Sequence, residues 1–389
     1  MDEVAKASGK IYLIGAGPGD PKLLTIKAAE AIGASDVIVY DYLVNPEVLA
    51  HSRRNAEVID AGKRAGQPST SQAHIVQYKQ EELRFSNAAV DIAGTLMLPT
   101  TKGPHPAVIF VPSSGVATRD SSRFLADLFA RRGIAAFIYD KRGAGGSTGD
   151  WLQASFDDLA ADSLAAIRVL KNRKDINPRQ IGLRGQSQGA RVAAITASRS
   201  KDIAFVILVA PGKLNPEQQE LRRVEYEMRR DGFSEGDIRE ALMLMRMKFR
   251  FARTGNEWDE YKAAVEKARD MKWFSYALAP FSKDDPSFRF WRLVNDYEPV
   301  KAWEKVRPPV LAILGELDTN TPVSETAAIM KEALKQAGNK IFFIEVLPRA
   351  EHTLFVRQEK GGQWKWPRFA NGYVEWQNNW LLQRVTLGK

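Results

Sequence analysis

The sequence predicts an α/β fold with a mainly parallel sheet in the larger, carboxy-terminal part of the chain, preceded by a shorter βαβ segment. From about residue 105 onward, short apolar runs alternate with amphipathic stretches, as in parallel sheets that helices cover on both faces. The 389 residues are 44% apolar and 26% charged, which is the composition of a globular protein. At roughly 150 residues per domain, this length allows two or three units.

The elements of the larger part follow from periodicity. Residues 81–99 alternate in character and predict a hairpin. Apolar runs bounded by Gly, Pro or Asp predict six further strands, at 107–111, 135–139, 181–185, 205–209, 310–314 and 341–346. Helical periodicity predicts four helices between them, at 122–132, 156–172, 189–198 and 323–336.

Composition excludes several classes of protein. The chain has no cysteine, so disulfides, thiolate metal sites and cysteine nucleophiles are excluded. The four histidines, at 51, 74, 105 and 352, are far apart, and we expect no metal site.

No apolar run approaches the roughly 18 residues of a membrane span. The net charge is +9, but basic and acidic residues are mixed along the sequence, so we expect no nucleic-acid partner. The first residues lack an apolar secretory segment, and a cytoplasmic location is expected.

The segment before residue 80 starts as a βαβ unit. The run at 11–14 predicts a strand, GAGPGDP a glycine-rich turn, 23–32 a helix and 37–40 a second strand. A glycine-rich turn between strand and helix lets the backbone approach a ligand and directs helix N–H groups toward anions. Taken alone, this turn is weak evidence for a ligand, because such glycines also serve simply to make tight turns.

The longer segment GAGPGDPKLLTIKAAEAIGASDVIVYDYLV, followed by GKRAGQPSTSQAHIVQ, resembles the opening of uroporphyrinogen-III C-methyltransferases over residues 9–78. These enzymes methylate a tetrapyrrole with S-adenosylmethionine. Five positions match family positions: Gly15, Gly17, Gly19, Asp20 and Asp41. The family's later GGDP segment, which holds much of the methyl donor, is absent. We therefore expect a truncated half-domain without methyltransferase activity. The resemblance also implies dimerising enzymes, so the segment is a candidate for pairing two chains.

The sequence GQSQG, residues 185–189, follows an apolar strand and precedes a helix. In this context a G-x-S-x-G motif forms a sharp turn that exposes the serine at the carboxyl end of the sheet. The glycines on either side remove side chains that would clash in such a turn. Ser187 is therefore the predicted nucleophile.

A serine nucleophile needs a base, and the base needs an acid to orient it. The motif in this context resembles that of α/β-hydrolases, in which the acid and the histidine follow the serine, and His352 is the one histidine after residue 187. The acid is expected after the strand at 310–314, where LGELDTNTP offers Glu316 and Asp318. We choose Asp318, because Asp-x-x-x-Pro after G-E-x resembles the acid turn of α/β-hydrolases.

The oxyanion of an acyl-transfer reaction needs two convergent N–H donors. The first expected donor is the backbone N–H of Gln188, directly after the nucleophile. The second is expected in the loop PSSGVATRD after the strand at 107–111. Ser114 takes the place of the variable residue in the H-G-x-G loop of hydrolases, and Gly115 is the next candidate.

Residues 81–389 as a whole resemble α/β-hydrolases of the carboxylesterase type, a group with acyl-peptidase and acyl-thioesterase relatives. The resemblance rests on SSGVATRD, YDKRGAGGSTGDW, IGLRGQSQGA, LGELDTNTPV and AEHTLF in this order. It implies an α/β-hydrolase fold. We expect Asp140 and Arg142 to close the turn after their strand as an ion pair. Arg184 departs from the apolar residue usual in its strand, and it could pair with an acid below the nucleophile; its role stays open.

Residues 212–299 form an insertion whose pattern predicts charged helices with Met and aromatic positions. An insertion at this point predicts a helical cap over the expected active site. Its apolar side chains would line an acyl or alcohol pocket, or form the cap's own core. The expected domains are 1–78 and 79–389.

Together these features predict a serine carboxylesterase that hydrolyses small-molecule carboxylic esters through an acyl-enzyme, without cofactor, metal or membrane partner. Two alternatives stay open. One is an acyl-peptidase or acyl-thioesterase with the same triad, and the other is a tetrapyrrole-binding or assembly module built on the first segment.

Overall fold

The computed structural model describes residues 12, 14, 24–40, 44–53, 55–60, 76–357 and 368–386. The chain divides into two units, Met1–Val76 with Gln363–Arg368 and Gln77–Gly362 with Phe369–Lys389. The division between Val76 and Gln77 lies two residues before the expected boundary at residue 78. Among the described residues, no helix combines the length and apolar character that crossing a membrane requires.

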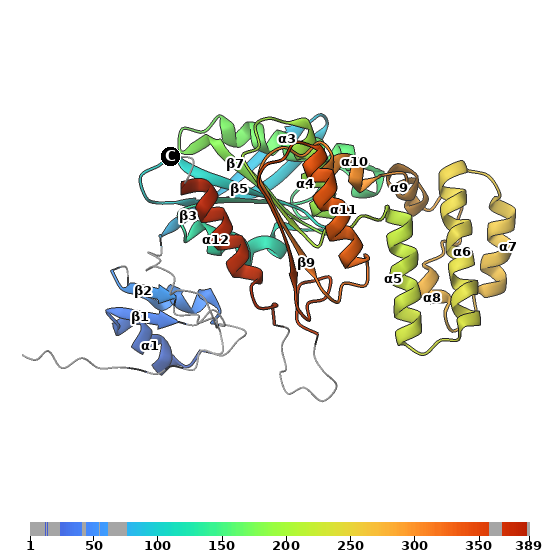
Figure 1. Ribbon diagram of the computed structural model, residues 1–389, viewed down its shortest axis with the longest axis horizontal. Coiled ribbons are helices and arrows are strands. Elements are labelled where there is room, and N and C mark those ends of the chain that lie inside the picture. The colour runs from blue at the N-terminus through green and yellow to red at the C-terminus, as the bar shows by residue number, and fades with distance from the viewer. Residues whose placement is uncertain are drawn as a thin grey trace, which may run out of the picture. The chain divides into compact units, whose positions relative to one another are not determined.

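The first unit contains a helix and two short parallel strands (Figure 1). Its elements are α1 (Ile26–Ala34), β1 (Val37–Tyr40), the 3₁₀ helix η2 (Pro46–His51) and β2 (Glu57–Asp60). The strand predicted at 37–40 is confirmed as β1, and the helix predicted at 23–32 is confirmed with its start three residues later. The Thr25 hydroxyl caps α1 by accepting a hydrogen bond from the Ala28 amide.

The expected ligand turn of this unit lies outside the described residues. Gly15, Gly17, Gly19, Asp20 and Asp41 all fall there, as do two of the four positions of the strand predicted at 11–14.

The second unit is built on an eight-stranded mixed sheet with the strand order β10-β9-β8-β7-β5-β6-β4-β3. β3 and β4 form the predicted hairpin, β4 runs antiparallel to β6, and all other neighbours are parallel. The strands are β3 (Tyr78–Asn87), β4 (Val90–Pro99), β5 (His105–Val111), β6 (Ala135–Tyr139), β7 (Ile176–Gln186), β8 (Val206–Val209), β9 (Val310–Gly315) and β10 (Phe342–Leu347). The α/β-hydrolase fold expected from the sequence is therefore present.

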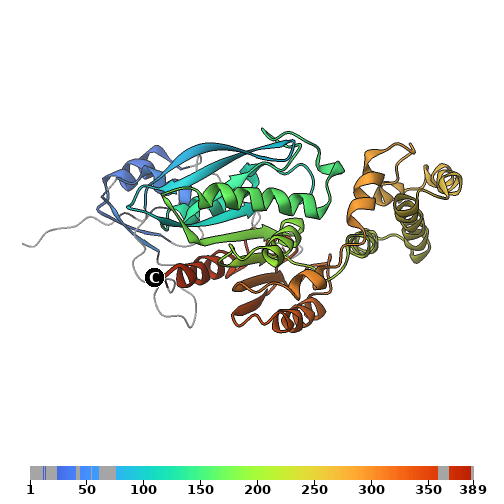
Figure 2. The same ribbon diagram turned by 90° about the horizontal axis from the view of Figure 1, so that it is seen from above.

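Helices cover both faces of this sheet, and Figure 2 gives the second view of the arrangement. One apolar core forms between the sheet and α3 (Phe156–Lys171), α4 (Gln188–Arg199), α10 (Pro299–Trp303) and α11 (Val323–Gln336). A second core forms on the other face with α2 (Arg123–Ala130) and α12 (Tyr373–Thr386). The 3₁₀ helices η3 (Arg119–Ser122) and η4 (Trp151–Gln153) lie in the connecting loops.

The insertion between β8 and β9 forms a helical cap with its own core. It contains α5 (Pro216–Arg230), α6 (Glu235–Thr254), α7 (Trp258–Ala268), α8 (Phe274–Ala277) and α9 (Pro286–Val294). In Figure 1, α5, α6 and α7 lie side by side. Each of α5 and α6 begins with a capping box, from Asn215 and Ser234.

The prediction of an ion pair between Asp140 and Arg142 is wrong. Each of the two side chains pairs with a residue of a different neighbouring element. Asp140 is buried and pairs with Arg119, whose Nη2 lies 2.8 Å from its Oδ2. Arg142 donates from Nη2 at 2.7 Å and from Nε at 2.8 Å to the carboxylate of Asp162 on α3. Two ion pairs instead of one therefore fix the loop that follows β6.

Arg184 does not pair with an acid among the described residues. It is 5% exposed, and its guanidinium donates to the Tyr373 hydroxyl at 2.5 Å and to Gln377 Oε1 at 3.2 Å. Both partners belong to α12, so Arg184 joins the sheet to the last described helix.

We predict that Asp162→Ala destabilises the second unit by about 3–5 kcal/mol, because it leaves the guanidinium of Arg142 largely buried without its anion. Urea unfolding followed by tryptophan fluorescence measures this loss. The matched control is Asp202→Ala, which removes the half-exposed partner of Lys171 and should cost at most about 1 kcal/mol. Equal losses of unfolding free energy in the two variants would show that the Arg142–Asp162 ion pair stabilises the fold no more than an exposed pair does.

Candidate active site

Ser187 lies in the turn between β7 and α4. Its backbone has φ 54° and ψ −117°, a conformation that residues other than glycine rarely adopt. A Cβ atom on Gly185 would lie 2.1 Å from the carbonyl oxygen of Gly189, and one on Gly189 would lie 2.5 Å from that of Val111. Both glycines are therefore required for the turn to pack against its surroundings. This geometry agrees with the sharp strand-to-helix turn that the G-x-S-x-G motif predicts.

The structure brings Ser187, His352 and Asp318 together. The Nε2 atom of His352 lies 2.9 Å from Ser187 Oγ, and its Nδ1 atom lies 2.7 Å from Asp318 Oδ2. Protonated at Nδ1, the imidazole would donate to Asp318 and keep Nε2 free to accept the serine proton. The three groups can thus work as nucleophile, base and orienting acid.

Asp318 and Glu316, the two candidates for the acid, have different partners. The Asp318 side chain is fully buried, and its Oδ1 atom accepts a hydrogen bond from the Asn320 amide at 2.8 Å. Glu316 is exposed and accepts from the Arg349 amide at 2.8 Å. Only Asp318 of the two has a hydrogen bond to His352 in the structure.

The loop that carries His352 packs directly on the end of β9. The Leu317 amide donates to the carbonyl of Ala350 at 2.8 Å. A Cβ atom on Gly315 would lie 2.4 Å from the carbonyl oxygen of Glu351, so the close approach needs a glycine there. The acid and the histidine are therefore held by backbone contact between their two loops.

The two expected oxyanion donors lie on segments that meet at the nucleophile turn. Gln188 is the first residue of α4, so its backbone N–H belongs to the unpaired amides of a helix start. Ser114 lies in the exposed loop after β5. The end of β5 approaches α4 closely, because Val111 and Pro112 are the residues that a Cβ on Gly189 would meet.

Lys141 is a residue at this site that the sequence analysis missed. It is 2% exposed, and its Nζ atom donates to the carbonyl of Ser113 at 3.1 Å and to the Gln188 side-chain oxygen. Burial lowers the pKa of Lys141 to about 7. The signal that points to it in the sequence is its place in YDKRGAGGS, directly after a strand of the sheet and between Asp140 and Arg142.

Most apolar side chains of the cap belong to its own core. Leu242, Met245, Phe249, Phe251, Tyr261 and Trp273 are buried there, and Met247, Trp258, Phe274 and Tyr276 pack against them. Met243 is exposed. This agrees with the expectation that the cap has its own core; nothing in the described residues identifies a substrate pocket lined by these side chains.

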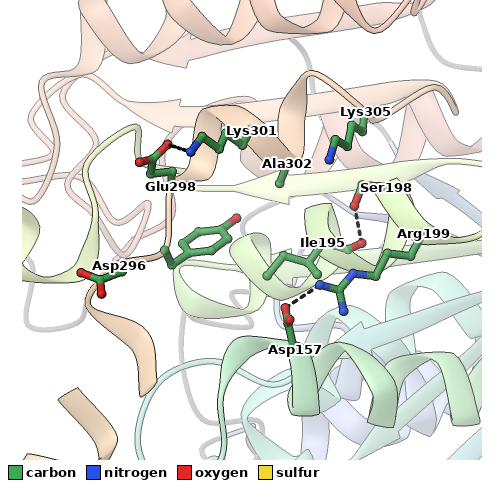
Figure 3. A pocket seen from close by; sticks show the side chains of 10 residues that line it. Asp157, Ile195, Ser198, Arg199, Asp296, Glu298, Lys301, Ala302 and Lys305 are labelled. Carbon is green, nitrogen blue, oxygen red and sulfur yellow. Dashed lines mark hydrogen bonds and ion pairs between the residues drawn. The ribbon is translucent and has the colours of Figure 1, made fainter. Parts of the chain in front are cut away.

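A surface pocket of about 340 Å³ lies between α3, α4 and the start of α10 (Figure 3). Ion pairs of Arg199 with Asp157 and of Lys301 with Glu298 occupy its rim. Neither Ser187 nor His352 lines it, so it is separate from the candidate active site. Within the described part of the chain, no three acidic or histidine side chains gather as metal ligands would.

Three family models match successive parts of the chain. Residues 10–93 match the tetrapyrrole (corrin/porphyrin) methylases, 103–233 the serine aminopeptidases of family S33, and 252–377 the prolyl oligopeptidase family. The methylase match extends beyond the expected residue 78 into the hairpin of β3 and β4.

The curated relatives match only a part of the chain. A uroporphyrinogen-III C-methyltransferase of Pseudomonas fluorescens is 56% identical over 85 residues, which are 22% of this chain and 34% of that enzyme. The chain spans about a third of the length of the uroporphyrinogen-III C-methyltransferases that it matches.

Solved structures match the second unit at low identity, which shows its fold. The α/β hydrolase GrgF from Penicillium sp. sh18 has a TM-score of 0.51 and 20% identity, covering 79% of this chain and 98% of its own. An esterase of Pyrococcus furiosus, Pf2001, has a TM-score of 0.50 and 16% identity, covering 84% and 97%. The chain thus joins a segment similar to the start of tetrapyrrole methylases to an α/β-hydrolase region.

Proposed function

We propose that the second unit is a serine carboxylesterase that hydrolyses carboxylic esters through an acyl-enzyme. The observation that carries the proposal is the hydrogen-bonded series of Ser187, His352 and Asp318, with distances of 2.9 and 2.7 Å. These are hydrogen-bonding distances for a nucleophile and its base.

In the proposed mechanism, Ser187 Oγ attacks the ester carbonyl while His352 Nε2 takes the hydroxyl proton. The carbonyl oxygen becomes an oxyanion, and the amides of Gln188 and Ser114 stabilise it. When the tetrahedral intermediate collapses, the bond to the alcohol oxygen breaks and His352 returns the proton to the leaving alcohol. Water then attacks the acyl-enzyme by the same steps, with His352 again as base, and releases the acid.

Asp318 holds the imidazole in the tautomer that accepts at Nε2, and its negative charge stabilises the imidazolium formed during attack. The buried carboxylate and the backbone contact between the loops of β9 and β10 keep this geometry fixed before substrate arrives. No step of this mechanism needs a metal or a cofactor.

Esters are the favoured substrates, and peptides or thioesters are the alternative with the same triad. The two family models that match the hydrolase region are named for peptidases, whereas Pf2001 is described as an esterase. A peptidase of the aminopeptidase type needs groups that bind the substrate's amino terminus. Glu316 and Glu351, the acids beside Asp318 and His352, already bind the Arg349 amide and Arg357, which favours the ester proposal.

For the first segment we propose a role in pairing two chains rather than methyl transfer. Four of its large apolar side chains are strongly exposed: Tyr12 at 53%, Ile26 at 80%, Val37 at 47% and Val39 at 60%. Exposed apolar side chains grouped on one small unit favour association. A tetrapyrrole-binding module remains the alternative, and titration with a porphyrinogen analogue separates the two roles.

We predict that Ser187→Ala and His352→Ala each lower kcat for a p-nitrophenyl ester by at least about 10⁴-fold, because triad members act as a unit. The double variant should lose little more than either single one. Asp318→Asn should lose about 10⁴-fold through the wrong tautomer. Glu316→Gln is the matched control and should stay within about 3-fold of the wild type, since its acceptor oxygen is retained. A larger loss for Glu316→Gln than for Asp318→Asn would reassign the acid.

A second prediction concerns the substrate class. In a panel of p-nitrophenyl esters of increasing acyl length, a matched thioester and a matched peptide anilide, we expect the esters to give the highest kcat/KM. Ser187→Ala serves as the blank for each substrate. A peptide turned over faster than every ester would replace the carboxylesterase assignment with the peptidase alternative.

A third prediction tests the first segment. A chain that starts at Gln77 keeps the complete triad, and we expect it to hydrolyse esters at the wild-type kcat per active site. Light scattering at matched concentration should give fewer chains per particle than for the full chain. Val39→Asp in the full chain should have the same effect, because it places a charge on the exposed apolar group. An unchanged particle size in both variants would remove the pairing role.

A further inference from the structure

Lys141 is a buried cation beside the proposed oxyanion site. It directly follows Asp140 at the end of β6 and is 2% exposed. Its Nζ atom also lies 5.1 Å from the ring centroid of Trp151, on the side of the loop after β6. Protein atoms therefore surround the ammonium group and shield it from solvent.

The hydrogen bonds of Lys141 join two separate segments. Ser113, whose carbonyl accepts from Nζ at 3.1 Å, directly precedes Ser114 in the loop after β5. Gln188, whose side-chain oxygen is the second acceptor, opens α4. One ammonium therefore contacts both of the segments that carry the proposed N–H donors, and it fixes one relative to the other.

Lys141 has no anionic partner within the described residues, since both of its hydrogen-bond acceptors are neutral. The charged residues on either side of it in sequence are already paired, Asp140 with Arg119 and Arg142 with Asp162. Burying a cation without an anion is costly, and burial accordingly lowers the pKa of Lys141 to about 7. A negative charge that appears only during the reaction would relieve this cost at the transition state.

We propose that Lys141 is a positioning residue of the oxyanion site, which holds the Ser114 loop against Gln188 and adds a positive charge that favours the oxyanion. The inference rests on the proposed serine hydrolase mechanism. In that mechanism Lys141 makes no bond to the substrate, and it acts through Ser113 and Gln188.

The test compares Lys141→Met with Lys141→Arg. The Met side chain has a similar length but neither charge nor N–H, so we expect kcat to fall by about 10²-fold with KM changed less than about 3-fold. An alkyl boronic acid, which forms a tetrahedral anion on the serine, should bind more weakly by a similar factor. Lys141→Arg retains charge and donors and should recover at least about 10-fold of the lost kcat.

The matched control is Lys248→Met. Lys248 is also 2% exposed, but its Nζ atom donates to the Ala277 carbonyl at 2.8 Å inside the cap. Burial lowers its pKa to about 8. The control therefore removes a buried lysine of similar character away from the site, and kcat should stay within about 2-fold of the wild type.

A second readout separates this inference from the proposed function. A fluorophosphonate phosphonylates the nucleophilic serine with loss of fluoride, and this labelling does not require that the right ester be in the panel. Its phosphoryl oxygen takes the oxyanion position. Labelling that Ser187→Ala does not abolish would contradict the serine hydrolase itself. Normal labelling rate and boronate affinity in Lys141→Met, or losses equal to those of Lys248→Met, would overturn the role of Lys141 alone.

Discussion

The turn at Ser187 is the constraint on which the candidate site depends. Its backbone has a positive φ on a residue with a side chain, a conformation that costs about 1–3 kcal/mol and must be held by its surroundings. Those surroundings are the Gly185–Gly189 contact, the approach of the β5 end to Gly189, and the hydrogen bond from the Ser187 amide to the Val209 carbonyl. The central strands therefore fix the position of the hydroxyl, and the loops need only bring their groups to it.

The order of strands in the sheet brings those loops together. The parallel strands β5, β6, β7, β8, β9 and β10 have their carboxyl ends at one edge of the sheet, where α/β proteins place their sites. The loops after β9 and β10 supply Asp318 and His352, while the loop after β5 supplies Ser114 from the other side of β7. The loop after β6, fixed by the Asp140–Arg119 and Arg142–Asp162 pairs, brings Lys141 under both proposed oxyanion segments.

Much of this arrangement could be predicted because each part leaves a local signal. Apolar runs located the parallel strands within a few residues, and the strand–serine–helix context led to Ser187, from which chain order led to His352. Side-chain partners were harder, since Asp140 and Arg142 are neighbours in sequence but bind Arg119 and Asp162 from other elements. Lys141 was missed because its burial depends on the tertiary fold. The helix α12 was also missed, although Trp380, Leu381 and Val385 show helical spacing and are buried.

The proposed mechanism requires that Ser187 becomes acylated during ester hydrolysis, and mass spectrometry can detect this acyl group. The protein is mixed with a p-nitrophenyl ester, quenched in acid within the first turnovers and digested. We expect a peptide containing Ser187 that is heavier by one acyl group and absent from the Ser187→Ala variant. Ester turnover with the acyl group on another residue, or with no acyl-peptide under conditions that trap the intermediate, would contradict it.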